Sequence, residues 1–561
     1  MIRTFETHRI RKQRELTNCF WEFEPCGGEY AGEKFQVYTP SCWENHPNFR
    51  NYRGEGIYRT RFYLGGNARL EFKGVSHTAT IYVDGKCVGT HYNAYSIFTV
   101  ELRNLKEDWH TLEVKADNRF SEKSALHVPN DYMSYGGLSR PVVLESIEDT
   151  FIEWVHVTPK MAAQTDSMEA GTSWEAEVEV CVKNISPDRK VVDITSTIQE
   201  KVLEWKAQQI PAGENIRVRG TLAFDQVIPW SQEEPKLYYV ENTLKDKDVI
   251  VDDLIDRFGF RQGTVKGKQI LINGQAVKIK GLCRHEDHPQ FGCALPAAAI
   301  AADLEIIKDL GANSIRTAHY PNDEVFLDMC DEQGILVWEE NHARGLSLED
   351  MMNPNFEEQA EQVIREMIPA HYNHPSIYIW GILNECASDS EYGKECYRKQ
   401  FELIKQLDTS RPHSFASCKF KTDISFGLPD VVSYNIYPLW YHDTPPEEYL
   451  DDLYQWVQQD TEGAGKPFLI TEIGAGAIYG CRNAYHSKWT EEYQEEALEK
   501  QLHAVLNYKD CCGVYIWQFC DIRISDEWFG GRPRTMNNKG IVDEYRRPKL
   551  SYDIVKKMYK E

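Results

Sequence analysis

The chain has 561 residues, of which 42% are hydrophobic and 27% charged, and its formal net charge is −24. A chain of this length exceeds one hydrophobic core, so about three to four domains are expected, and no stretch reaches the roughly 18 consecutive apolar residues of a membrane span. The acidic balance argues against nucleic acid or an anionic membrane as partner, because both attract a basic surface.

The N-terminus and the cysteines bear on the compartment. The opening MIRTFETHRIRKQREL lacks the apolar core of a secretory signal. The 15 cysteines are scattered and form no CxxC pair, a pattern typical of reduced, mostly buried thiols. We therefore expect a cytoplasmic location.

Residues 1 to about 262 have the pattern of an all-β region. Short alternating runs such as ARLEFKGV and HTLEVKADN are separated by turn residues. The Asp-Gly pair at 84–85, between two β-rich runs, predicts a hairpin. A break near 147–155 divides the region into a larger sandwich, 1–150, and a smaller one, 151–262.

From about residue 263 to residue 561, apolar runs alternate with helix-like stretches such as 299–312 and 355–372. Eight such runs favour closure into a parallel eight-stranded (β/α)8 barrel. An open doubly wound sheet is the alternative, although no Gly-rich phosphate turn follows any of the runs. The predicted strands are 276–282, 313–320, 335–340, 376–385, 413–418, 430–437, 467–474 and 513–519.

Polar side chains gather where these apolar runs end. Barrel strands are covered by helices and are therefore apolar, whereas active sites form at their C-terminal ends. Any one of these residues could simply bond its own loop, but the set predicts a functional site at the barrel mouth. Its members are His285, Glu286, His319, Glu339, Glu340, Asn384, Glu385, Asn435, Tyr437, Glu472 and Trp517.

Two of these residues predict a reaction. Glu385 ends the fourth predicted strand and Glu472 the seventh, so both should point into the barrel mouth from opposite sides. Two facing carboxylates suit glycoside hydrolysis, with retention of configuration if they lie about 5–5.5 Å apart. Asn384 could donate to a sugar 2-hydroxyl. Aromatic faces for stacking on a sugar are offered by Trp517, Trp440, Tyr437 and Tyr441.

Five motifs carry a resemblance to a known family. GLCRHEDHP, NSIRTAHYPN, DEQGILVWEE, NHPSIYIWGILNE and PFLITEIG, in that order, resemble glycoside hydrolase family 2, and the resemblance covers nearly the whole chain. It implies a jelly roll at 1–150, an immunoglobulin-like sandwich at 151–262 and a catalytic TIM barrel at 263–561. It also implies Glu385 as acid/base and Glu472 as nucleophile, with no cofactor.

Within the family, NNKG at 537–540 is similar to the Asn-x-Lys-Gly pattern of β-glucuronidases, which implies that Asn537 and Lys539 contact a uronic acid. DYMSYGGLSRPV resembles the loop that their jelly roll sends to the barrel, which implies a sugar contact by Asp131. NIYPLWY departs from the pattern of bacterial glucuronidases. It keeps Asn435, Tyr437, Trp440 and Tyr441.

We expect an exo-glycosidase whose substrate is a small-molecule β-D-uronide. The expected assembly is a homo-oligomer. Arg344, after the third strand, adds a cation near the mouth. Because of this cation, a galacturonide is a candidate sugar as well as a glucuronide. In so acidic a chain, an acidic ligand requires local cations. A β-galactosidase acting on neutral sugars is the alternative, and a non-catalytic carbohydrate-binding protein is a remote one.

Several residues keep a second interpretation. RHEDH at 284–288 offers metal ligands, but neighbours at a strand end point in opposite directions, so we favour His285 as a sugar contact and expect no metal. His319 could be a sugar contact or a core histidine. Cys386 is expected to be a packing residue. The basic group Arg532, Arg534 and Lys539 could be a site or a solvated loop.

Overall fold

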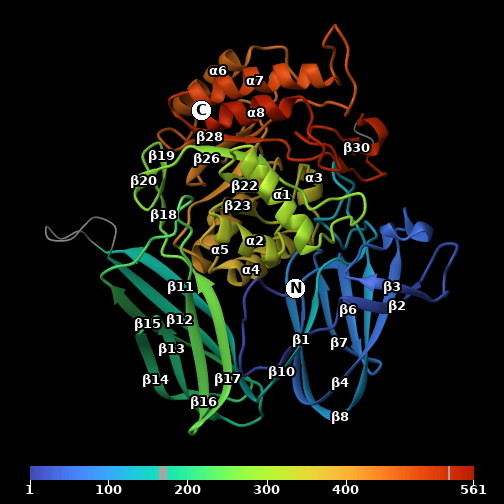
Figure 1. Ribbon diagram of the computed structural model, residues 1–561, viewed down its shortest axis with the longest axis vertical. Helices are drawn as coiled ribbons and strands as arrows, with labels where there is room; N and C mark the ends of the chain where they lie inside the picture. Colours follow the sequence, from blue (N-terminus) through green and yellow to red (C-terminus); the bar gives the residue numbers. More distant parts are fainter. Residues whose placement is uncertain (163–172, 529–530) are drawn as a thin grey trace.

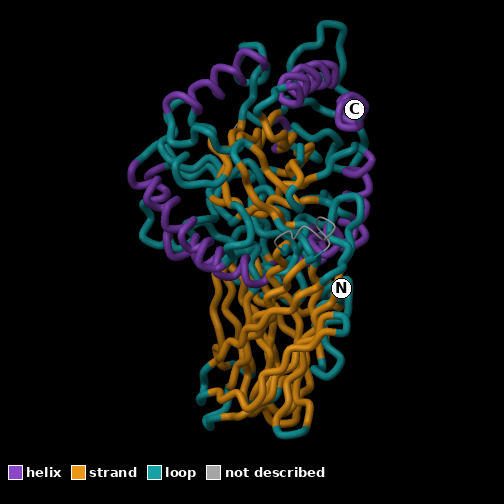
Figure 2. The backbone as a smooth tube through the Cα atoms, turned by 90° about the vertical axis from the view of Figure 1, so that its left-hand side faces the viewer, coloured by secondary structure: helices purple, strands orange, loops and turns teal. Residues whose placement is uncertain are grey.

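The computed structural model describes residues 1–162, 173–528 and 531–561. Two β-sandwiches stand side by side beneath a barrel surrounded by helices (Figure 1). In the view turned by 90°, the sandwiches form a block of strands and the helices surround the upper part of the molecule (Figure 2). Within the described ranges, every helix is too short or too polar to cross a membrane.

The N-terminal sandwich, blue in Figure 1, is an antiparallel sheet centred on two long strands that pair with each other. Its core is aromatic and includes Trp21, Phe23 and Tyr58. The expected hairpin is confirmed, since Asp84 and Gly85 both have positive φ between two paired strands. The strands are β1 (Gln13–Glu15), β2 (Cys19–Pro25), β3 (Phe35–Thr39), β4 (Glu55–Phe72), β6 (Thr78–Val83), β7 (Lys86–Tyr92), β8 (Phe98–Asp117) and β10 (Val142–Ile147), with β5 (Val75–Ser76) and β9 (Gly137–Leu138) as a separate pair.

The second sandwich consists of a three-stranded and a four-stranded antiparallel sheet around a core rich in β-branched residues. A small sheet then leads into the barrel. The sandwich strands are β11 (Thr150–Met161), β12 (Trp174–Asn184), β13 (Lys190–Ile198), β14 (Lys201–Ile210), β15 (Asn215–Phe224), β16 (Tyr238–Asp246) and β17 (Val249–Phe258). The small sheet comprises β18 (Gly263–Lys266), β19 (Gln269–Ile272) and β20 (Gln275–Ala276).

The C-terminal part is a closed parallel barrel, because its last strand pairs with its first. This closure confirms the predicted (β/α)8 fold and excludes the open sheet. The strands are buried along almost their whole length, which explains their continuous apolar sequence. They are β21 (Ile279–Cys283), β22 (Ser314–Arg316), β23 (Leu336–Glu340), β24 (Ile377–Ile382), β25 (His413–Ser417), β26 (Val431–Asn435), β27 (Phe468–Ile473) and β28 (Cys511–Ile516).

Helices cover the outside of the barrel, as Figure 1 shows. The two predicted helical stretches correspond to α1 and α4. The helices are α1 (Ala297–Asp309), α2 (Glu324–Gln333), α3 (Leu348–Met351), α4 (Phe356–His371), α5 (Glu391–Leu407), α6 (Pro446–Asp460), α7 (Glu491–Asn507) and α8 (Ser551–Lys560).

Two segments outside the barrel strands reach its C-terminal mouth. One is the jelly-roll segment after β8, where Asn130 bonds Arg344 of the barrel. The other follows β28 and contains the short pair β29 (Ile522–Arg523) and β30 (Met536–Asn537). Asn537 of this second segment donates to Asp131 of the first, at 3.0 Å. The two segments therefore meet over the barrel mouth.

Candidate active site

Glu385 and Glu472 lie at the mouth on nearly opposite strands. Glu472 is in β27, and its carboxylate is buried. Glu385 follows β24 with a φ of +56°, and its backbone N–H donates to the carbonyl of Ala416 in the neighbouring strand at 2.9 Å. A left-handed backbone is uncommon for a glutamate and clusters at functional sites. The turn after β24 therefore directs Glu385 into the mouth.

Glu472 accepts two hydrogen bonds that fix its position. Arg316 Nη1 donates to Oε1 at 2.8 Å, and the Tyr437 hydroxyl donates to Oε2 at 2.5 Å. Burial raises the pKa of Glu472 to about 7, and the negative charge of Glu385 adds to this rise, while Arg316 opposes it. The two carboxylates are therefore electrostatically coupled.

Arg316 organises this side of the site from the end of β22. It is fully buried and also donates to both oxygens of Glu340, at 3.0 and 3.2 Å. It donates at 2.7 Å to Oδ1 of Asn384, and Nδ2 of the same amide has no partner in the described ranges. This amide is therefore free to bind a ligand.

Glu385 is bonded from two other directions. Asn435 Nδ2 donates to its Oε1 at 2.9 Å, and Arg344 Nη2 lies 3.5 Å from its Oε2. Arg344 is held in turn by Asn130 of the jelly roll. Burial opposes the charged form of Arg344, but Glu385, Asp131 and Glu472 outweigh it, so the pKa of Arg344 is raised. Arg344 is therefore a permanent cation beside Glu385.

The predicted sugar-contacting histidines line the floor of the mouth. His319 stacks on Trp517, with ring centroids 5.0 Å apart, and its Nδ1 lies 2.7 Å from the carboxylate of Glu340. His285 Nδ1 lies 3.1 Å from the hydroxyl of Tyr320. Burial lowers the pKa of both histidines well below the usual value, so both rings are neutral. The Nε2 atoms of both rings are buried and have no hydrogen-bond partner among the described residues. Such atoms in a neutral site are suited to sugar hydroxyls.

A second group of residues forms a cationic corner at the mouth. Arg532 binds both carboxylate oxygens of Asp131, at 3.0 and 2.6 Å, and Asn537 donates to the same carboxylate. Asp131 is thus fully engaged by its two neighbours and buried. Arg534, which we grouped with these cations, is exposed.

Lys539 is the notable cation of this corner. It is 2% exposed, and its Nζ donates to the hydroxyl of Tyr441 at 2.9 Å. The ammonium lies over the rings of Tyr437, Trp440 and Tyr441 at 5.1–5.8 Å. Among the described residues, no carboxylate lies within ion-pair distance of it. Burial lowers the pKa of Lys539, although nearby Tyr441 and Asp131 counteract part of this effect. A buried ammonium without a counterion is costly and favours an anionic ligand.

Sequence reasoning missed the residues that hold Lys539 in place. Asp521 and Lys549 form a fully buried ion pair of 2.7 Å beneath the 537–540 loop. Asp521 accepts from the backbone N–H of Gly540 and the side chain of Asn538, and Lys549 donates to the carbonyl of Asn538. No motif pointed to this pair. Arg316 lay inside the predicted strand 313–320 and was not singled out, because only the observed strand β22 ends at this residue.

The candidate metal ligands have other partners. In RHEDH, Glu286 pairs with Arg140, and Asp287 accepts from Tyr135, so the side chains diverge. Cys386 is buried with its thiol on a backbone carbonyl. These contacts agree with structural roles.

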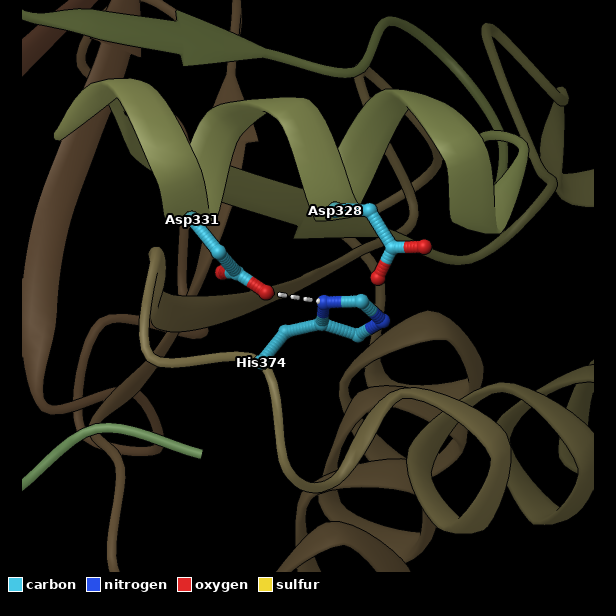
Figure 3. Close-up of side chains that lie close together, drawn as sticks. All are labelled: Asp328, Asp331 and His374. Atoms are coloured by element: carbon cyan, nitrogen blue, oxygen red, sulfur yellow. Dashed lines mark hydrogen bonds and ion pairs between the residues drawn. The ribbon is translucent and has the colours of Figure 1, made fainter. Parts of the chain in front are cut away.

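Asp328, Asp331 and His374 do lie close together (Figure 3). However, Asp328 is bound by Arg3 at 2.7 and 2.9 Å, and Asp331 accepts from His374. His374 precedes β24, whereas Glu385 follows it, so the cluster lies at the opposite end of the barrel from the site. We interpret it as a network that fastens the N-terminal segment to α2.

Comparison with known proteins places these features in a family. Residues 264–561 match Glycosyl hydrolases family 2, TIM barrel domain, and residues 148–261 match Glycosyl hydrolases family 2. The chain is 58% identical to a β-galacturonidase from Eisenbergiella tayi whose crystal structure is bound to galacturonate. That comparison covers 100% of this chain and 99% of the other, with a TM-score of 0.96.

More distant relatives are named either β-glucuronidase or β-galactosidase. A β-glucuronidase of Paenibacillus borealis is 26% identical over 535 residues, covering 89% of this chain and 86% of the relative. A β-galactosidase of Thermoanaerobacter pseudethanolicus is 29% identical and covers 89% of this chain but 64% of the relative.

Proposed function

Since the chain belongs to glycosyl hydrolases family 2 and is a glycoside hydrolase, we propose that it removes terminal β-D-uronic acid residues with retention of configuration. The observation that carries the choice of an acidic sugar is the buried ammonium of Lys539, which has no carboxylate partner among the residues that the structure describes. The similarity to a β-galacturonidase over the whole chain supports the same choice. Among uronides, we propose a galacturonide as the preferred substrate.

The reaction proceeds by two displacements at the anomeric carbon. The ionised carboxylate of Glu472 attacks this carbon while the protonated carboxyl of Glu385 transfers its proton to the leaving oxygen. Water, deprotonated by Glu385, then attacks the glycosyl ester and releases Glu472. A separation of about 5–5.5 Å between the two carboxyl groups is expected for this mechanism.

Neighbouring residues divide the two roles. Arg316 and Tyr437 both donate to Glu472, which stabilises its ionised form and aligns it for attack. Asn384 is held by Arg316 through Oδ1, and its Nδ2, which has no partner among the described residues, suits the 2-hydroxyl of the sugar. Hydrogen bonds to this hydroxyl strengthen in the transition state of glycosidases.

The carboxylate of the sugar would occupy the cationic corner. Lys539 supplies a charge that no carboxylate of the described residues neutralises, and the Tyr441 hydroxyl accepts from it at 2.9 Å. Burial opposes ionisation of this phenol, but Lys539 and Arg532 outweigh it, so the pKa of Tyr441 is lowered. Arg532 is already neutralised by Asp131. We therefore assign Lys539 the direct ion pair and Asp131 a role in orienting Arg532 and Asn537.

Arg344 suits the 4-hydroxyl of a galacturonide. It lies on the side of Glu385, at 3.5 Å from its carboxylate, and bonds Asn130, which precedes Asp131 of the cationic corner. A donor on this side would favour one epimer at C4 over the other. This assignment rests on the placement of Arg344 and on the resemblance to the galacturonidase.

The β-galactosidase alternative has support from two relatives of that name, but it gives the buried charge of Lys539 no anionic partner. A non-catalytic sugar-binding protein would not need two coupled carboxylates. The deciding experiment measures kcat/KM on the nitrophenyl β-glycosides of galacturonic acid, glucuronic acid and galactose. A preference for the galactoside would refute the proposal. A homo-oligomeric assembly and a cytoplasmic location stay predictions from the sequence.

A further inference from the structure

Two thiols from different domains meet at the boundary between the jelly roll and the barrel. Cys42 follows β3 in the jelly roll, and Cys293 lies in the barrel loop between β21 and α1. Although 251 positions separate them in the chain, their Sγ atoms are 3.5 Å apart. Both are buried, with 1% and 8% of their surface exposed.

The barrel loop is shaped to reach Cys42. His288 and Gly292 exchange two backbone hydrogen bonds, at 2.8 and 3.0 Å, which close the loop into a tight turn. Gly292 has a φ of +57°, and a Cβ at this position would lie 2.8 Å from the sulfur of Cys42. It would also lie 3.1 Å from the ring of Tyr135. A glycine at 292 is therefore what allows the loop to pack against the thiol.

We propose that Cys42 and Cys293 are a site of reversible oxidation, at which a disulfide ties the jelly roll to the barrel. The sulfurs are in contact and need to approach by about 1.5 Å to reach the bond length of a disulfide. The two thiols share an apolar cluster with Met133 and Tyr135, and the nearest charged influence on Cys42 is Glu44, two positions along the chain. The site is independent of the reaction at Glu385 and Glu472.

The oxidant is a low-molecular-weight disulfide such as glutathione disulfide. The thiolate of one cysteine attacks it, forming a mixed disulfide and releasing one glutathione thiolate. The thiolate of the second cysteine then attacks the protein sulfur and expels the second glutathione. The two cysteines together lose two electrons and two protons, which glutathione carries away.

Two hollows lie close to the pair and are lined by its neighbours in the chain. Phe291, two positions before Cys293, borders one hollow of about 880 Å³ and another of about 270 Å³. Cys293 is the more exposed thiol and is the one that should react first. Burial raises the pKa of the Cys42 thiol, so oxidation should be slow at neutral pH and faster at alkaline pH.

The bond would restrain a separation of domains. It closes a loop that contains most of the jelly roll and the whole second sandwich, so the jelly roll cannot move away from the barrel without carrying this loop. A cross-link of this kind slows irreversible unfolding when domain separation precedes it. Oxidation should therefore lengthen the half-life of the enzyme at high temperature.

The test uses a full-length reference protein in which the exposed cysteines are replaced, because these would otherwise take up glutathione. The replacements are Cys19→Ser, Cys26→Ser, Cys87→Ser and Cys418→Ser. The reference is incubated with glutathione disulfide and measured by intact mass, by peptide mapping without reductant, and by the half-life of activity at a fixed high temperature. We expect the loss of two hydrogens, a peptide joining Cys42 to Cys293, and a half-life at least about threefold longer.

Three variants of the reference complete the design. Cys42→Ser and Cys293→Ser should form no cross-link and gain no half-life, whereas Cys181→Ser, a buried thiol of the second sandwich, should behave like the reference. Dithiothreitol should reverse the gain. A mass that only increases by glutathione, a cross-link between other cysteines, or a cross-link without a longer half-life would each overturn the proposal.

Discussion

Asn130 and Arg344 hold each other across the boundary between the jelly roll and the barrel. The guanidinium of Arg344 donates to Oδ1 of Asn130 at 2.9 Å, and Nδ2 of Asn130 donates to the backbone carbonyl of Arg344 at 3.1 Å. The jelly roll therefore sets the position of a cation that lies 3.5 Å from Glu385. A domain outside the barrel contributes in this way to the catalytic site.

This relationship predicts an effect on sugar preference. Asn130→Ala should lower kcat/KM for the galacturonide by about 2- to 13-fold, the equivalent of one neutral hydrogen bond, and should lower it less for the glucuronide. Asn48→Ala, an exposed asparagine of the same domain, is the control. Equal losses on the two epimers would show that Arg344 does not recognise the 4-hydroxyl.

The two glutamates should differ in their dependence on the leaving group. Glu472→Gln should abolish turnover of every substrate, since no nucleophile remains. Glu385→Gln should slow substrates with poor leaving groups most, because an activated phenol needs little protonation to depart. The measurement is kcat/KM across a series of aryl uronides. If the loss of kcat/KM did not depend on the acidity of the phenol, Glu385 would not be the catalytic acid.

The pH profile should be bell-shaped with a maximum on the mildly acidic side of neutral. The active form carries one proton on the pair, with Glu385 protonated and Glu472 ionised. Burial and the charge of Glu385 raise the pKa of Glu472 to about 7, so the pair retains a shared proton up to that range and loses it above. Activity therefore falls above about pH 7, and it falls again in acid when the second carboxylate takes a proton.

The pH profile of the Glu385→Gln variant tests the same coupling more directly. Glutamine resembles the protonated acid and removes the negative charge that helps raise the pKa of Glu472. With a good leaving group, the variant should retain the acid limb of the profile and lose the alkaline limb. A rate that is flat from about pH 4 to 9 in the unmodified enzyme would contradict the coupling of the two carboxylates.

Much of the fold and part of the site could be predicted from the sequence, for local reasons. The barrel strands are covered on both faces, so runs such as that of β24 are continuously apolar and visible in the sequence. Glu385 and Glu472 were visible because they end such runs. The bond between Asp131 and Arg532 joins positions 401 residues apart, and no local pattern encodes it. The same holds for the pairing of Asp521 with Lys549.

The buried pair beneath the 537–540 loop gives a prediction of its own. Asp521→Asn removes the charge that balances Lys549 but can keep the hydrogen bond from the backbone N–H of Gly540, so it tests mainly the ion pair. Breaking such a pair costs about 3–5 kcal/mol of stability. We expect a lower thermal midpoint and a higher KM for uronides, because Lys539 loses its fixed position. An unchanged KM together with a lower midpoint would limit the pair to a structural role.

Lys539 provides the decisive prediction about the substrate. It is buried among three aromatic rings, and within the described part of the chain its ammonium bonds the hydroxyl of Tyr441 and has no carboxylate as counterion, although the net charge of the chain is −24. A charge-assisted bond to a uronate contributes about 1.5–3 kcal/mol, so Lys539→Ala should lower kcat/KM on a nitrophenyl β-uronide by roughly 10- to 150-fold. The same variant should leave the low rate on the matching galactoside nearly unchanged, because a neutral sugar has no carboxylate to lose. Equal losses on galacturonide, glucuronide and galactoside would mean that Lys539 only supports the fold of the loop, and the acidic-sugar assignment would fail with it.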